Sequence, residues 1–369
     1  MSSRVAISEI AKIHYGKSLV ESQRDSNGSY LVYGSNGAVG MHSARIFDYP
    51  SLIIDRKGSV GEVIFAPDGG WAIDTTFYIE LNDRNAVDLR YLFYALKSAN
   101  LQKHTITTSI PGLNRDDVYR TKIEIPAIQE QRRIATILDK ADAIRRKRRQ
   151  AIDLMNDFLR SVFLEMFGDP VSNPKNWELH KLGEIGNVVT GNTPPRAHPE
   201  YYGSSIEWIK SDNINTPSHY LTKATEFLSD EGKVVGRAVP TGSILVTCIA
   251  GSPSCIGNAA FTDREVTFNQ QINAVVPDES CNSKYLYALF YVGKKLIQAA
   301  STNSMKGMVS KTKFESIEVP VPPISLQNKF AKCFDVLNRS LDSYHSSLLN
   351  SNRLFDSLSG SLMNTGVER

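Results

Sequence analysis

The chain has 369 residues and a net charge of +3, and 41% of its residues are hydrophobic, 9% aromatic and 22% charged. This length allows two or three domains with cores of their own, and the composition is that of a soluble globular protein. No apolar run approaches the roughly 20 residues that a membrane-spanning helix needs, and the first residues lack the pattern of a signal peptide, so we expect a cytoplasmic protein without membrane contact.

Residues 1–126 form the first predicted domain. Short β-like runs such as Ser51–Ile54 alternate with glycine, asparagine and proline turns, which indicates a mixed α/β domain. Pro126 marks the end of this domain, because proline suits the first turn of a helix and fits badly inside one. A long helix is predicted over residues 127–168.

The second half of the chain has the same organisation. A mixed region over residues 169–323 contains β-like runs such as Gly242–Thr247 and ends at Pro320 and Pro322–Pro323. A second long helix is predicted over residues 324–369. The predicted fold class is therefore α+β, with two mixed domains separated by two long helices.

Sequence matches in a constant order show that the two halves are copies of one duplicated unit. Six pairs of segments match: 7–18 with 182–193, 58–65 with 254–261, 73–77 with 268–272, 91–96 with 285–290, 107–113 with 302–308, and 125–134 with 321–330.

Apolar residues in the second predicted helix are spaced alternately by four and three residues, which is typical of a coiled-coil seam. The seam residues are Phe330, Phe334, Leu337, Leu341, Tyr344, Leu348, Ser351, Phe355, Leu358 and Leu362. The aligned positions of the first helix are Ile134, Leu138, Ala141, Arg145, Arg148, Ile152, Met155, Leu159, Val162 and Met166. Each helix has roughly 40 residues, about 60 Å in length. We predict that the two helices pair antiparallel, which would place the domains at opposite ends about a pseudo-twofold axis.

Several motifs of the chain, taken in order, resemble the DNA-specificity subunits of type I restriction–modification systems across nearly its whole length. The motifs are 33–37, 55–61 and 110–113 in the first domain, 125–135 at the first helix, and 190–194, 201–212 and 268–271 in the second domain. Residues 325–328 of the second helix depart from the pattern of residues 129–132.

This resemblance implies a non-catalytic subunit whose two target-recognition domains each recognise one half of a split double-stranded DNA site. The helices would set the spacing and dock two modification (methyltransferase) subunits, through which restriction–translocation subunits join. The chain would need no cofactor of its own, since S-adenosylmethionine, ATP and magnesium would be used by the partners.

Sequence motifs for catalysis are absent. There is no Asn/Asp-Pro-Pro-Tyr/Phe motif, no complete phosphate loop, no HExxH pair and no GxSxG elbow. The four cysteines lack CxxC spacing and are expected to be reduced, mostly buried thiols rather than zinc ligands. We therefore predict no catalytic and no metal-binding residues.

Polar, glycine-bounded loops are the candidate DNA-binding sites, because glycine lets the backbone approach a phosphate and polar side chains can bind phosphates or base edges. The first-domain candidates are Tyr33, Asn36, Arg56, Lys57, Ser59, Thr107, Thr108 and Ser109. The second-domain candidates are Lys210, Ser211, Asp212, Asn213, Gln270, Gln271, Asn303, Ser304 and Lys306.

For each of these loops a structural role remains open. Tyr33 and Asn36 could be turn residues, the turn at Arg56–Ser59 a solvated hairpin tip, and Gln270 with Gln271 a buried polar pair that bonds the sheet backbone.

The basic surplus lies mainly in residues 127–168, which carry 9 basic and 6 acidic side chains. DNA binding must therefore use local basic loops rather than a strongly positive domain. The run Arg145, Arg146, Arg148 and Arg149 could be a solvated helix face, a docking surface for acidic groups of a partner, or a contact to DNA phosphates.

Two other functions remain as alternatives, a nucleotide-binding hydrolase and a coiled-coil scaffold.

Overall fold

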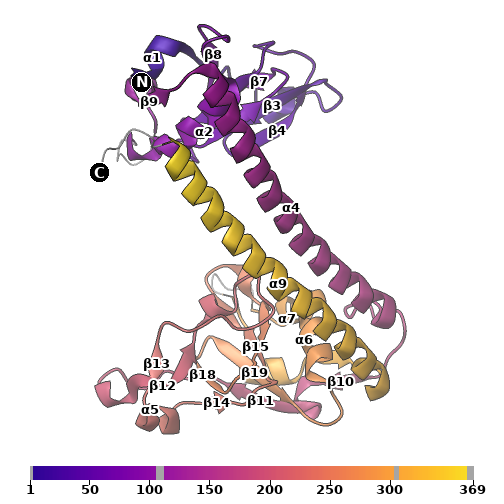
Figure 1. Cartoon of the computed structure of the whole chain (residues 1–369). Helices are drawn as coiled ribbons and strands as arrows, with labels where there is room; N and C mark the ends of the chain where they lie inside the picture. The colour runs from indigo at the N-terminus through magenta and orange to yellow at the C-terminus, as the bar shows by residue number, and fades with distance from the viewer. Residues whose placement is uncertain (1–2, 105–111, 303–306, 364–369) are drawn as a thin grey trace. The chain divides into compact units, whose positions relative to one another are not determined.

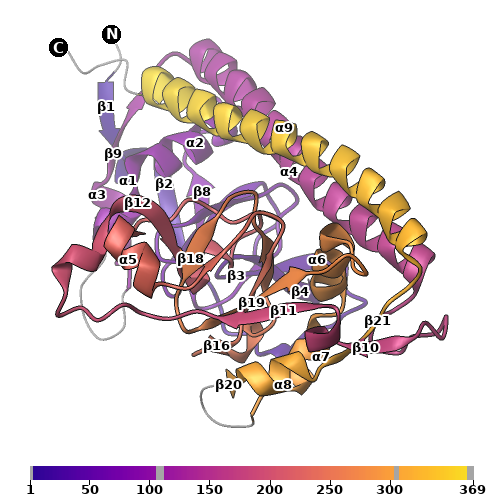
Figure 2. The same ribbon diagram turned by 90° about the horizontal axis from the view of Figure 1, so that it is seen from below.

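A computed structural model describes residues 3–104, 112–302 and 307–363. The chain forms two compact units: the first comprises Met1–Arg149 and Ser346–Arg369, and the second comprises Gln150–His345. The elements of each unit can be followed in Figure 1 and, from a second direction, in Figure 2.

The main sheet of the first unit has four antiparallel strands in the order β2-β8-β5-β6. These strands are β2 Ala11–Tyr15, β5 Ser51–Asp55, β6 Val63–Ala66 and β8 Thr76–Leu81. Helix α2, Leu89–Ala99, packs against β5 and β6. Strand β5 is buried along its whole length because it lies inside the sheet and under this helix, whereas β8 is buried only in part.

A smaller sheet, β4-β3-β7, and a strand pair, β1-β9, complete the first unit. Their bounds are β1 Ser3–Ala6, β3 Tyr30–Gly34, β4 Gly37–His42, β7 Trp71–Ala72 and β9 Lys122–Ile125. Strands β3 and β7 run parallel, whereas the other pairs are antiparallel.

The second unit repeats this topology. Its main sheet has the order β11-β19-β15-β17, its smaller sheet the order β13-β12-β18-β14, and its strand pair is β10-β21. The strands are β10 Leu179–Lys181, β11 Gly186–Thr190, β12 Tyr202–Ile209, β13 Phe227–Leu228, β14 Ala238–Val239, β15 Ile244–Thr247, β17 Ala259–Phe261, β18 Val266–Phe268, β19 Ile272–Pro277 and β21 Glu318–Pro320. Helix α6, Ser283–Val292, packs on β15 and β17 as α2 does on β5 and β6. The predicted duplication is thus confirmed.

The remaining elements are short. The α-helices are α1 Ile7–Ile10, α3 Arg115–Arg120, α5 Asp230–Val235, α7 Lys294–Ala299 and α8 Lys311–Glu315. The 3-10 turns are η1 Glu21–Gln23, η2 Leu101–His104, η3 Leu182–Glu184, η4 Pro199–Tyr201, η5 Ser211–Asn213 and η6 Pro253–Cys255, and β16 Ile249–Ala250 pairs with β20 Gly307–Met308.

Two of the six predicted segment matches were wrong by one residue. The amides of Gly16 and Gly191 donate to the carbonyls of Thr76 and Ile272, so Thr76 corresponds to Ile272 rather than to Gln271. The Leu113 amide donates to the Arg56 carbonyl, and the Val309 amide donates to the Cys248 carbonyl. Leu113 therefore corresponds to Val309 rather than to Met308. The sequence matches had followed similar side chains, whereas the ladder hydrogen bonds fix the true correspondence.

The two long helices are α4, Ile128–Phe167, and α9, Ile324–Met363, each of 40 residues as predicted. Pro126 and Pro323 lie just before them. In the second unit Phe163 and Phe167 of α4 pack on Phe330 of α9, so the end of one helix meets the start of the other. This antiparallel pairing confirms the prediction.

The predicted coiled-coil seam is also confirmed. All ten predicted positions of α4 are buried or half-buried, and so are nine of the ten positions of α9. The exception is Tyr344, which is 38% exposed. Apolar burial along both seams therefore drives the helices together.

A buried glutamine joins each domain to the start of its long helix. The Gln131 amide group accepts from the backbone N–H of Asp88 at 2.8 Å and donates to the carbonyls of Ala86 at 2.9 Å and Pro126 at 2.8 Å. Gln131 is fully buried. It thus binds the N-terminal end of α2 to the first turn of α4.

Gln327 makes the same three bonds in the second unit. It accepts from the backbone N–H of Asn282 at 2.8 Å and donates to the carbonyls of Ser280 at 3.3 Å and Pro322 at 2.7 Å. We call these two arrangements the glutamine clasps. An ion pair accompanies each clasp, Arg90 with Asp139 in the first unit and Lys284 with Asp335 in the second.

Within the described ranges no helix is long and apolar enough to cross a membrane. All four cysteines are free, and Cys248 and Cys281 are buried. Burial raises the pKa of both thiols to about 12. Cys255 is half-buried and Cys333 exposed, so the expected burial holds for two of the four thiols.

Candidate nucleic-acid interface

The hairpin between β3 and β4 turns at Asn36 and Gly37. Both have positive φ, 77° and 117°, a backbone conformation that asparagine and glycine adopt most readily. Asn36 is exposed at the tip, whereas Tyr33, at the base, is only 3% exposed. Burial of Tyr33, aided by the charge of Asp68, raises the pKa of its hydroxyl.

Hydrogen bonds join this hairpin to the turn between β5 and β6. The Asn36 amide donates to Asp55 Oδ2 at 3.0 Å, and Ser35 Oγ donates to the Lys57 carbonyl at 2.6 Å. Ser59 Oγ donates to Asn36 Oδ1. The structure therefore brings together Asn36, Lys57 and Ser59, which the sequence had placed in two separate motifs.

A third segment reaches the same place. Lys57 forms a β-bridge with Gly112, and the Leu113 amide donates to the Arg56 carbonyl at 3.0 Å. The predicted residues Thr107, Thr108 and Ser109 precede this segment and lie outside the described residues.

Arginine side chains lie on aromatic rings beside these loops. The Arg56 guanidinium lies 5.1 Å from the Tyr15 ring centroid and donates to the Asp74 carbonyl at 3.1 Å. The Arg115 guanidinium also lies 5.1 Å from the Tyr15 ring. Lys57 is exposed. Sequence reasoning missed Arg115, because only the fold brings it to the ring that Arg56 contacts.

Asp55 is a buried carboxyl under the loops. It is 0% exposed, and its Oδ1 has no hydrogen-bond partner among the described residues. Burial raises its pKa from 3.8 to about 6, the bond from the Asn36 amide opposes this shift, and Glu62 adds to it.

This shift predicts a pH dependence of stability. Between pH 3.8 and about 6 the folded chain binds the Asp55 proton and the unfolded chain does not, so the free energy of unfolding falls as the pH rises through this window. We expect Asp55→Asn to flatten this part of the curve, measured by thermal unfolding at pH 4 to 8. An unchanged slope in the variant would show that other groups cause it.

In the second unit Lys210 lies at the end of β12. Its ammonium pairs with Glu226 and lies 5.3 Å from the Trp208 ring. Arg196 pairs with the other oxygen of Glu226 at 2.7 Å and lies over the Tyr202 ring at 4.2 Å. Arg196 is not among the residues that the sequence analysis selected, because only the fold brings it to Glu226 and the Tyr202 ring.

Gln271 connects the Lys210–Asn213 segment to the β18–β19 loop. Its side-chain oxygen accepts from Ser211 Oγ and from Asn269 Nδ2, each at 3.1 Å. Its backbone oxygen accepts from the amides of Cys248 and Ile249, at 2.8 and 3.0 Å. Gln270 is exposed and Gln271 half-buried, so they do not form the buried pair bonded to the sheet backbone that was the alternative; the Gln271 side chain joins two loops instead.

The other second-domain candidates differ in exposure. Asp212 and Gln270 are exposed, and Gln270 accepts from Thr193 Oγ1. Asn213 is 7% exposed, and its side chain bonds to backbone groups of Lys210 and Lys223. Burial therefore favours structural roles for Tyr33 and Asn213 over direct contact with DNA. Asn303, Ser304 and Lys306 fall outside the part of the chain that the structure describes.

Arg145 and Arg148 lie in the seam of the first unit. The Arg145 guanidinium stacks 3.7 Å from the Phe355 ring centroid and pairs with Asp142 at 2.5 Å, while Arg148 donates to the Ser347 carbonyl at 2.8 Å. None of the three interpretations of the basic run included this packing role. Arg146 and Arg149 are exposed, which leaves only these two of the four predicted docking residues as surface cations.

No group of three or more metal-ligating side chains lies together in the described residues.

The profile of the family described as "Type I restriction modification DNA specificity domain" matches residues 3–154 and again residues 174–350. The chain belongs to this family. The two matches each begin with one recognition domain and end within its long helix, as the duplication predicts. The sequence-based identification of the family is confirmed.

Individual relatives of this specificity-domain family are distant in sequence. The chain is 29% identical over 158 residues to the HindI specificity subunit of Haemophilus influenzae, covering 40% of this chain and 32% of the relative. It is 22% identical over 310 residues to the MjaVIII specificity subunit of Methanocaldococcus jannaschii, covering 76% and 70%. The matched region is about a third of the length of the first curated relatives.

The fold of this specificity-family chain is also that of a solved structure. It superposes on the crystal structure of the type I restriction–modification S subunit from M. genitalium with a TM-score of 0.65 and 19% identity, over 98% of this chain and 96% of the other.

Proposed function

We propose that the chain is the non-catalytic DNA-specificity subunit of a type I restriction–modification complex. Each target-recognition domain would recognise one half of a bipartite double-stranded DNA site, and α4 and α9 would set the spacing. The observation that carries this proposal is the duplicated family match on a duplicated fold.

The loops of the first domain suit a DNA surface. Three segments that are far apart in sequence meet around Lys57, with the Arg56 and Arg115 guanidinium groups beside them. Backbone and side-chain donors next to cations bind phosphates, and exposed amides such as that of Asn36 can bond base edges. The second domain offers the same kinds of groups: Arg196 and Lys210 supply cations, and Gln270 supplies a side-chain amide.

The partners in this proposal are two modification subunits and, through them, restriction–translocation subunits. S-adenosylmethionine, ATP and magnesium would be bound by those partners. The exposed Arg146 and Arg149 remain candidates for docking acidic groups of a partner, whereas Arg145 and Arg148 are engaged in the seam.

The test is to map methylated bases in cells that carry this chain with its modification subunits and no other methyltransferase. We expect methylation at sites with two fixed half-sequences separated by a constant gap. Cells with the modification subunits alone are the control. Methylation at a continuous site, or methylation that does not depend on this chain, would contradict the proposal.

A further inference from the structure

The second recognition domain has a segment that the first lacks. In the first domain β3 and β4 are joined by two residues, Ser35 and Asn36. In the second domain β12 ends at Ile209 and β13 begins at Phe227, and residues 210–226 lie between them. This segment contains the candidates Lys210, Ser211 and Asp212. A long connection of this kind needs side-chain bonds to fix its conformation.

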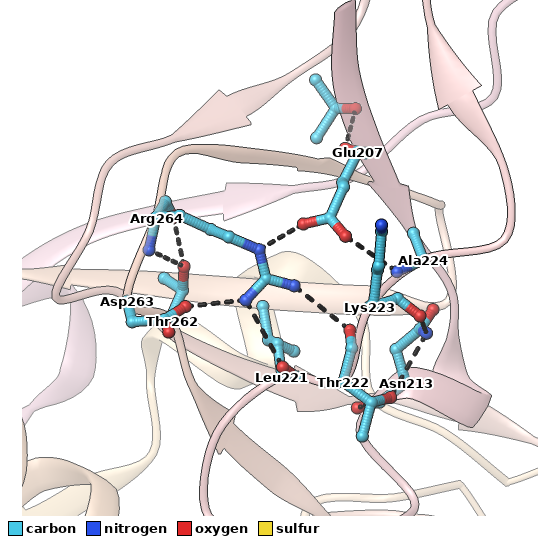
Figure 3. Close-up of polar contacts among 10 residues, drawn as sticks. Glu207, Asn213, Leu221, Thr222, Lys223, Ala224, Thr262, Asp263 and Arg264 are labelled. Atoms are coloured by element: carbon cyan, nitrogen blue, oxygen red, sulfur yellow. Dashed lines mark hydrogen bonds and ion pairs between the residues drawn. The ribbon is translucent and has the colours of Figure 1, made fainter. Parts of the chain in front are cut away.

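Arg264, in the turn between β17 and β18, supplies those bonds (Figure 3). Its Nη1 donates to the Leu221 carbonyl at 3.4 Å, and its Nη2 donates to the Thr222 carbonyl at 3.2 Å. Its Nε pairs with Glu207, and the other Glu207 oxygen accepts from the Ala224 amide at 2.9 Å. Arg264 and Glu207 together therefore hold residues 221–224 from two sides.

Residues 221–224 in turn hold the candidate DNA-binding residues. The Thr222 amide donates to the Asn213 carbonyl at 3.2 Å, and Asn213 Nδ2 donates to the Lys223 carbonyl at 3.1 Å. Asn213 Oδ1 accepts from the Lys210 amide at 3.0 Å. An unbroken series of hydrogen bonds thus runs from Arg264 to the backbone of Lys210.

The environment of Arg264 indicates positioning rather than contact with DNA. Two carboxylates, Glu207 and Asp263, already pair with its guanidinium, and Glu207 has a side chain only 10% exposed. A cation neutralised in this way has little attraction left for a phosphate. We infer that Arg264 is a positioning residue that fixes the 210–213 segment, and so determines how strictly the second half-site is recognised. This inference rests on the proposed function.

The test variant is Arg264→Lys in the full chain with its modification subunits. A lysine keeps the charge but cannot bond several acceptors in fixed directions as the planar guanidinium does. We expect discrimination against single mismatches in the second half-site to fall by about tenfold, because misplaced side chains lose part of their selective contact with the bases. Discrimination in the first half-site should stay within about twofold. The measurement is the methylation rate on duplexes with one mismatch in either half-site.

Glu207→Gln, which weakens the bonds of Glu207 to Arg264 and to the Ala224 amide, should lower discrimination in the second half-site as well. Glu265→Gln, one residue beyond Arg264 and exposed, is the matched control and should have no effect. An equal loss at both half-sites, or a lower melting temperature with unchanged discrimination, would overturn the inference. Failure of the proposed function would show separately, since the parent chain would then direct no methylation to a bipartite site.

Discussion

Gln131→Ala is expected to destabilise the first unit by roughly 2–4 kcal/mol, because the substitution leaves three backbone groups without their partners. These groups are the amide of Asp88 and the carbonyls of Ala86 and Pro126. Gln131 is fully buried, so water cannot replace its amide group without rearrangement. Gln327→Ala should have the same effect on the second unit, where the same three bonds recur.

Urea denaturation of the full chain checks this prediction, with Gln129→Ala as the matched control. Gln129 is exposed on the same helical turn and should change the free energy of unfolding by less than about 0.5 kcal/mol. If Gln131→Ala behaves like Gln129→Ala, the glutamine clasp contributes nothing and the domain is held to its helix by apolar packing alone.

The long-range organisation was predictable from the sequence because it is encoded by repetition and periodicity. The order of matched segments gave the duplicated topology, and the four–three spacing from Phe330 to Leu362 gave the seam. The prediction of a buried seam position was wrong for Tyr344, because a large ring with a polar hydroxyl fits an exposed position as well as a buried one.

Contacts between loops could not be predicted in this way. The bonds from Asn36 to Asp55 and from Arg264 to Thr222 join residues whose spacing carries no pattern. The sequence contains one weak indication of the role of Gln131, because a glutamine recurs at the aligned position 327. A match of one polar residue does not reveal its buried partners. Arg145 and Arg148 interrupt the apolar pattern of the first helix, but the stacking of Arg145 on Phe355 depends on the other helix.

Replacing residues 1–126 with the recognition domain of a relative should change one half of the DNA site completely and leave the other half intact. The Gln131 clasp makes this exchange feasible, because within the exchanged domain it bonds only backbone atoms. The two clasps show that such bonds tolerate different side chains, since Ala86 and Asp88 in one unit stand where Ser280 and Asn282 stand in the other. The recognition loops would travel with the exchanged domain.

Mapping methylated bases directed by this exchanged chain, beside the parent chain with the same modification subunits, tests the central claim most directly. The account predicts two bipartite sites that share the half recognised by residues 169–323 and differ in the other half, with the same gap. An active exchanged chain that keeps both original halves, or that changes both together, would contradict the assignment of one half-site to each domain.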